Sequence, residues 1–122
     1  MSYVSVEPHR PIDPQRIRLE RDGDIPLSFS GELIGEASNR TIRGDRQNRW
    51  TEVEIYRTAK ANWVAHIIGR SCWDGEVDRH SVVVAVNPLD LVEGLRDDDG
   101  YLGGVSREAL EVAGLEVTEN IE

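Results

Sequence analysis

The chain has 122 residues, of which 39% are apolar and 30% are charged, a balance typical of one folded, soluble domain. Fourteen Lys and Arg stand against 23 Asp and Glu, and the formal net charge of -9 argues against a surface that binds DNA, RNA or an anionic membrane throughout. The one cysteine, Cys72, excludes a disulfide framework and a multi-cysteine zinc site. Together with the lack of any apolar run of about 18 residues, this predicts a cytoplasmic protein without a membrane anchor.

The two ends of the chain are predicted to lie outside the domain. Prolines at positions 8, 11 and 14 remove backbone donors and favour extended geometry, so residues 1–14 are predicted to form a proline-containing arm. Residues 15–116 are predicted to form a single α+β domain, and residues 117–122 a frayed acidic tail.

Alternation of polar and apolar residues predicts the first two strands. Residues 16–20 alternate and are followed by a turn signal, which predicts a short strand and a bend. The next strand is predicted at 27–34, with Phe29 and Leu33 on one face and Gly31 as a candidate bulge.

The strand predicted at 50–57 has two distinct faces. Val53 and Ile55 are expected to face the core, whereas Glu52 and Glu54 are expected to face solvent.

Two more strands follow. Residues 63–69 are apolar on nearly both faces and are predicted to form a hairpin with the strand at 50–57. The β-branched run at 82–86 predicts a central strand buried on both faces, with Val84 in the core of the sheet.

Two short helices are predicted after the strands. Asn87 and Pro88 are typical of an N-cap and a first helical residue, which predicts a helix at 88–96. A second helix is predicted at 107–113, with Gly114 as its left-handed terminal residue. The predicted fold class is therefore α+β, a small antiparallel sheet of four to five strands followed by two C-terminal helices packed on one face.

The negative charge is concentrated in the C-terminal half. Residues 1–70 hold 11 basic and 10 acidic residues, whereas residues 71–122 hold 3 basic and 13 acidic ones. The acids Asp97, Asp98 and Asp99 belong to this half, which is either a solvated face that keeps the protein soluble or a surface for a basic partner, including imitation of a nucleic-acid backbone.

Against this background, guanidinium groups recur at every third position of a polar loop, at Arg40, Arg43, Arg46 and Arg49. Guanidinium groups form bidentate contacts with phosphate or carboxylate, so a phosphate-bearing or acidic ligand is one interpretation. Pairing with neighbouring acids is the other. Trp50 follows the loop and could complete an aromatic and arginine contact patch.

The sequence offers no specific catalytic, metal or cofactor motif. No histidine has a second histidine at ligand spacing in the sequence, and His66 is expected to be a half-buried sheet residue. The acids at 74–78 begin like a calcium loop, but Arg79 and Ala85 stand where glycine and glutamate are required. Cys72 is expected to be buried and inert.

These observations favour a small acidic interaction protein without catalytic activity that binds a protein or a ribonucleoprotein. Such a protein could be an inhibitor, antitoxin or immunity-type protein, of the kind made by phages or mobile elements, acting on a nucleic-acid-handling partner. Direct nucleic-acid binding is less favoured because of the net charge. The predicted binding residues are Arg40, Arg43, Arg46, Arg49, Trp50, Asp97, Asp98 and Asp99, with no metal and no cofactor. The alternative is a small arginine-based enzyme acting on RNA or a nucleotide, in which Tyr56 or His66 moves a proton.

Overall fold

The structure is a computed structural model and describes residues 15–40 and 48–115. The arm predicted at 1–14, the tail predicted at 117–122 and the central part of the arginine loop, with Arg43 and Arg46, lie outside these ranges.

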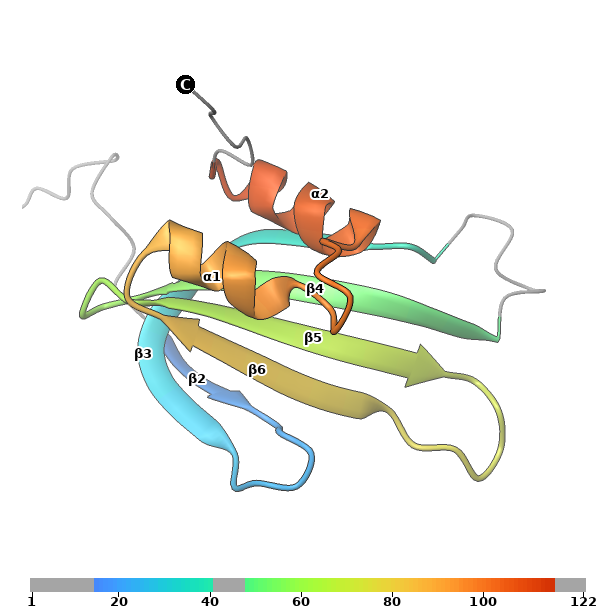
Figure 1. Cartoon of the computed structure of the whole chain (residues 1–122). Coiled ribbons are helices and arrows are strands. Elements are labelled where there is room, and N and C mark those ends of the chain that lie inside the picture. The colour runs from blue at the N-terminus through green and yellow to red at the C-terminus, as the bar shows by residue number, and fades with distance from the viewer. Residues whose placement is uncertain (1–14, 41–47, 116–122) are drawn as a thin grey trace, which may run out of the picture.

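Five antiparallel strands form one sheet in the order of the chain (Figure 1). The strands are β2 (Gln15–Leu19), β3 (Leu27–Ser38), β4 (Arg49–Thr58), β5 (Trp63–Ser71) and β6 (Arg79–Ala85). Two helices, α1 (Pro88–Leu95) and α2 (Gly104–Val112), follow and cover one face of the sheet. The predicted α+β fold class is confirmed. No helix in the described ranges is long and apolar enough to cross a membrane.

The main core lies between the sheet and the helices. Val53 and Ile55 of β4 are fully buried there, as their alternation predicts, and they pack in one cluster with Leu91 of α1 and Leu110 of α2. A Cβ atom on Gly35 of β3 would lie 2.6 Å from a backbone atom of α2, so the absence of a side chain lets α2 rest directly on β3.

A second, smaller core forms on the opposite face because β3 bends. The register between β3 and β4 shifts between Leu33 and Gly35, and the hairpin of β2 and β3 curls round toward the face that the helices leave open (Figure 1). Leu19 from this hairpin is buried with Tyr56 and Val64 of the sheet. The curled sheet is therefore a half-barrel.

The predicted bulge at Gly31 is wrong, because the register shift lies between Leu33 and Gly35. Gly31 has another role, since a Cβ atom there would lie 2.5 Å from the carbonyl oxygen of Arg57 on the neighbouring strand. Close approach of two backbones, rather than a bulge, requires glycine at this position.

The prediction of a central strand at 82–86 is also wrong. Among the described strands, β6 is the last of the sheet and pairs only with β5. Val84 is 55% exposed and Val86 is 72% exposed. The continuous apolar run suggested burial on both faces, but it belongs to an edge strand that α1 covers on one face only.

The ends of the helices follow from their sequence. Asn87 caps α1, since its side-chain oxygen accepts from the N–H of Asp90 at 2.8 Å. Gly114 ends α2 with a φ of 83°, and the N–H of Leu115 donates to the Leu110 carbonyl at 3.0 Å, as in a Schellman motif. The second helix begins at Gly104 rather than at 107, because Gly103 takes the N-cap position without a side-chain hydrogen bond.

Candidate functional site

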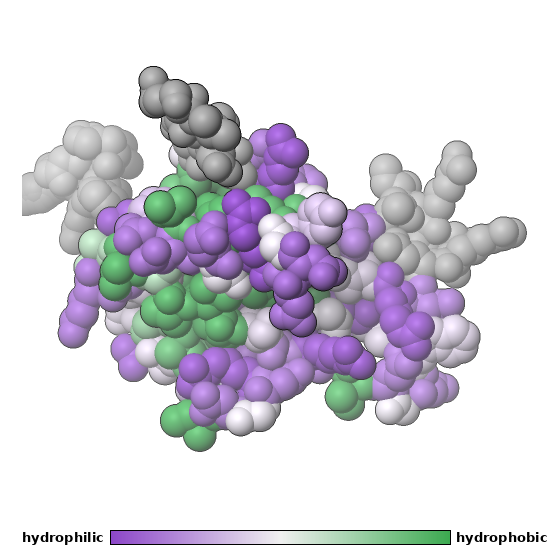
Figure 2. All heavy atoms as spheres, in the orientation of Figure 1, coloured by the Kyte–Doolittle hydropathy of each residue, from purple (hydrophilic) through white to green (hydrophobic). Residues whose placement is uncertain are grey.

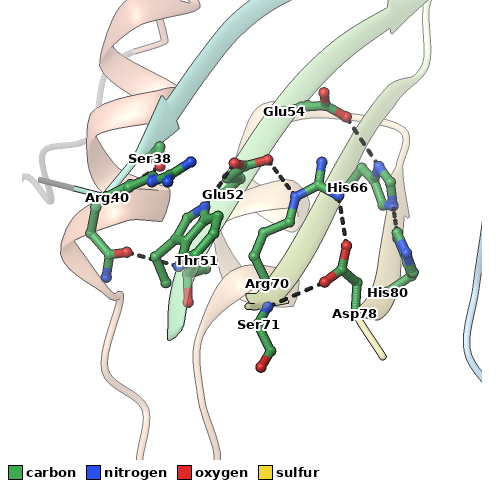
Figure 3. Close-up of polar contacts among 12 residues, drawn as sticks. Ser38, Arg40, Thr51, Glu52, Glu54, His66, Arg70, Ser71, Asp78 and His80 are labelled. Carbon is green, nitrogen blue, oxygen red and sulfur yellow. Dashed lines mark hydrogen bonds and ion pairs between the residues drawn. The ribbon is translucent and has the colours of Figure 1, made fainter. Parts of the chain in front are cut away.

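The face of the sheet that the helices leave open carries two groups of polar side chains. Figure 3 shows Glu54, His66 and His80 of one group beside Glu52, Arg70 and Asp78 of the other. One group joins Tyr56, Glu54, His66 and His80. The other joins Trp50, Glu52, Arg70 and Asp78. Period-two alternation places these residues on one face, and the strand register brings them within hydrogen-bond distance.

In the first group, a carboxylate is followed by two imidazoles. The Tyr56 hydroxyl donates to the Glu54 Oε1 atom at 2.9 Å, and Nδ1 of His66 lies 3.0 Å from the same oxygen. Nε2 of His66 lies 3.0 Å from Nδ1 of His80, and the planes of the two rings are nearly parallel, at an angle of 18°. In a hydrogen bond between these two nitrogen atoms one must accept, so only one of the two facing nitrogen atoms carries a proton.

The electrostatics of this group keep Glu54 ionised. The hydrogen bond from His66 lowers the pKa of Glu54 most, and the Tyr56 hydroxyl adds to this effect against the opposing effect of burial. Burial and the bond to Glu54 raise the pKa of the Tyr56 hydroxyl, so Tyr56 stays a neutral donor. Tyr56 is 8% exposed, which makes it a poor proton carrier for the alternative enzymatic hypothesis.

In the second group, one guanidinium joins two carboxylates. Nε of Arg70 donates to Glu52 at 3.0 Å and Nη1 donates to Asp78 at 2.8 Å. Glu52 also accepts from the indole N–H of Trp50 at 2.9 Å. The bond from Arg70 lowers the pKa of Asp78. Each charged group is therefore satisfied by a neighbour within the sheet.

Two predictions about this face need correction. Glu52 and Glu54 do not face open solvent, since each side chain is only 29% exposed and accepts hydrogen bonds from neighbours. His66 does have a second histidine close by. His80 is 14 residues further along the chain, and only the diagonal relation between β5 and β6 brings the two rings together. Spacing along the sequence gave no signal for this contact.

The predicted arginine residues within the described ranges have different neighbours. The Arg40 guanidinium lies over the Trp50 ring, 4.3 Å from its centroid, in a cation–π contact. Arg49 pairs with Glu76, with Nε 3.3 Å from Oε1. Arg49 is therefore paired with an acid of the C-terminal half, as the alternative interpretation of the loop predicts. That interpretation does not describe Arg40.

A hollow of about 630 Å³ lies where β4, β5 and β6 meet the Ser71–Asp78 segment, and we name it the strand-end hollow. Its lining comprises Asn39, Arg49, Trp50, Thr51, Gly69, Arg70, Ser71, Glu76, Val77 and Arg79. Three of these residues are arginines and one is acidic. Arg49 is paired with Glu76 and Arg70 with Glu52 and Asp78, so the hollow is rich in guanidinium groups but its charge is largely balanced.

Apolar side chains project from the segment beside this hollow. Trp73 is 51% exposed and Val77 is 83% exposed. No binding residue was predicted in this segment, although a tryptophan and a valine between turn residues were the available signal. Cys72 is exposed rather than buried, and its thiol lies 3.5 Å from the Asn48 side-chain oxygen.

The three predicted acids at the end of α1 form a separate feature. An Asp97 side-chain oxygen accepts from the N–H groups of Asp99 and Tyr101, both at 2.9 Å. This pattern closes the turn between the two helices. No contact among the described residues joins Asp97, Asp98 or Asp99 to the strand-end hollow, so the predicted binding residues do not form one site.

Within residues 15–40 and 48–115, no cluster of three His, Cys, Asp or Glu side chains could hold a metal ion. No protein family, no curated protein and no solved structure matches this chain.

Proposed function

We propose that the chain is a binding protein that docks on another macromolecule through the strand-end hollow. The observation that carries this proposal is the combination of an arginine-lined hollow of about 630 Å³ with exposed apolar side chains on the adjoining segment 71–78, where Val77 lines the hollow and Trp73 lies four residues before it. Arginine and tryptophan are enriched at the energetic centres of protein interfaces. Large apolar side chains that are exposed to this degree are otherwise costly to leave in water.

The chemistry of the hollow favours an acidic surface on the partner. The Arg79 charge acts on Glu76 from a distance, since it helps to lower the pKa of that carboxyl, and the Arg40 guanidinium contacts a ring rather than a carboxylate. Both guanidinium groups can form bidentate hydrogen bonds with a carboxylate or phosphate of the partner. A protein or ribonucleoprotein that handles nucleic acid carries such groups, and the chain would act on it as an inhibitor, antitoxin or immunity-type protein.

The internal pairing of the polar face supports binding over catalysis. Glu52, Asp78 and Arg70 neutralise one another, and Glu54 is engaged by two donors. Groups tied in this way stabilise the sheet and present little reactivity to a substrate.

The proposal is tested by capture from a lysate of the native host, with the immobilised chain and mass spectrometry. Val77→Asp places a charge at the margin of the hollow, and Val112→Asp makes the same change on α2, where Val112 is 58% exposed. We expect a partner that the wild type and Val112→Asp capture and that Val77→Asp loses. A partner retained equally by both variants would place the contact elsewhere and refute the role of the hollow.

A second candidate function rests on the Glu54, His66 and His80 chain. A carboxylate that orients an imidazole is the arrangement used by general bases, and no described side chain bonds to Nε2 of His80. Turnover of RNA or a nucleotide by the purified chain, abolished in His80→Gln while the fold is retained, would favour this arginine-assisted enzyme over the binding protein.

A further inference from the structure

Opposite residues in the sheet alternate between hydrogen-bonded and non-bonded pairs, and this alternation determines which backbone groups of β6 point outward. The N–H of Thr58 donates to the Asn62 carbonyl at 2.9 Å where β4 turns into β5. Antiparallel ladders alternate between bonded and non-bonded pairs, so the backbone groups of Val64 face β4. Val84, opposite Val64 in β6, therefore turns its N–H and carbonyl away from β5, and Val82 does the same.

The contact between Asp22 and His80 independently confirms which backbone groups of β6 point outward. The Asp22 N–H donates to the His80 carbonyl at 2.8 Å, and the His80 N–H donates to an Asp22 carboxylate oxygen at 3.0 Å. Both outward groups of His80 are thus satisfied from the β2–β3 turn. No described residue bonds to the outward groups of Val82 and Val84.

The two edges of the sheet differ in their side chains. Arg16 and Arg18 of β2 are exposed, and charged residues on an edge strand discourage pairing with other chains. On β6 the only charged residue is Arg79 at its start, and the stretch from Ser81 to Ala85 has none. Val84 in this stretch and Val86 just after it are exposed. Figure 2 shows apolar atoms gathered where β6 runs into α1.

From this edge we infer that two copies of the chain associate through β6. The two strands pair antiparallel about a two-fold axis at Val83, which joins both sheets into one. Val82 of each copy then lies opposite Val84 of the other, and the outward N–H and carbonyl groups of these residues satisfy one another. This association uses the β6 edge, which shares only Arg79 with the strand-end hollow, and it does not depend on the proposed function.

The length of the edge suits this pairing. Asp22 occupies the edge at His80, so a second strand can extend only as far as Ser81. With the axis at Val83, Ser81 lies opposite Ala85 of the second copy, which is the last residue of β6. The exposed stretch of the edge therefore matches the strand that would cover it.

Charges beyond the paired residues are complementary. Arg79 begins β6, and Asp90 lies in the first turn of α1, just after the strand. The two-fold axis brings Arg79 of each copy toward Asp90 of the other, twice over. α1 packs on β6, so the axis also places both copies of α1 side by side on one face of the joined sheet.

Sedimentation velocity over a series of concentrations tests this inference. We expect the wild-type mass to rise from 13.7 kDa toward twice that value. Val84→Lys should weaken association by about tenfold or more, because it places two charges together beside the axis. Val84→Pro should do the same by removing an outward N–H that takes no part in the β5 ladder. The matched control is Val112→Lys on α2, which should associate like the wild type.

Amide hydrogen exchange provides the second measurement. In the dimer, the amides of Val82 and Val84 should exchange slowly, and dilution should speed them. A monomer at every concentration would overturn the inference, whether these amides exchange quickly, as on a bare edge, or slowly, as when another part of the same chain covers them. Equal association of Val84→Lys and the wild type would overturn it as well.

Discussion

Nε2 of His66 lies 3.0 Å from Nδ1 of His80, and the backbone of the same His80 holds Asp22 of the β2–β3 turn by two hydrogen bonds. His80 thus connects the polar groups on the open face of the sheet to the β2–β3 hairpin that curls round toward that face. A displacement of His80 is therefore expected to disturb both the polar groups on that face and the position of the hairpin.

The first prediction concerns acid stability through Glu54. The folded-state pKa of Glu54 is lowered, first by the hydrogen bond from His66, so its contribution to stability is present above the unfolded pKa and is lost as pH falls through the folded pKa. Glu54→Gln should therefore cost about 1–2 kcal/mol at pH 7, and the difference from the wild type should shrink on acidification. Urea unfolding at pH 7 and at acidic pH measures this.

Glu108→Gln, an exposed change on α2, is the control and should leave the pH dependence as it is. A constant difference between Glu54→Gln and the wild type over the whole range would contradict the assigned role of the His66 bond.

The second prediction compares two valines that lie opposite each other in β5 and β6. Val84 is 55% exposed and Val64 is 1% exposed. Measured at concentrations too low for two copies to associate, Val84→Asp should cost no more than about 1 kcal/mol of unfolding free energy, because its carboxylate stays in water. Val64→Asp should unfold the domain, because it buries an unpaired charge. Thermal melts of both variants decide this, and a Val84→Asp chain that fails to fold would restore the central-strand interpretation of β6.

The third prediction concerns the seat of α2 on β3. Gly35→Ala places a Cβ atom 2.6 Å from the Ala109 carbonyl oxygen, so helix and strand must separate. We expect a loss of about 2–3 kcal/mol, within the range for overpacking. Gly104→Ala in the first turn of α2 meets no atom within 4 Å and should be neutral or slightly stabilising. Equal stability of the two variants would show that α2 does not rest on β3 as described.

The fourth prediction concerns Arg43 and Arg46, outside the described residues. Changing both to Ala should cost about 0.5 kcal/mol or less per site, as surface substitutions do. Partner binding should become weaker and less dependent on salt, because part of the attraction is screened charge. Calorimetric titrations at two salt concentrations measure this. A double variant that keeps full affinity would exclude the loop from the interface.

Patterns along the chain were sufficient for the fold class and for much of the core. Alternation at Val53 and Ile55, the cap at Asn87 and the glycine at 114 each depend on neighbours within a few residues. Such local signals determine elements and their ends.

The position of β6 and the candidate site could not be obtained in the same way. An apolar run such as that around Val84 is compatible with a central strand or with an edge, and only the strand order distinguishes them. His66 and His80, likewise, meet through strand register across 14 residues. Long-range register is a property of the whole sheet, so no local pattern predicts it.

The most direct test of the strand-end hollow as the binding surface is hydrogen exchange of the chain with and without its captured partner. We predict slower exchange in the complex at the Ser71–Asp78 segment and at the start of β4, with α2 unchanged. Protection confined to the turn at Asp97–Asp99, or to α2, would contradict the account.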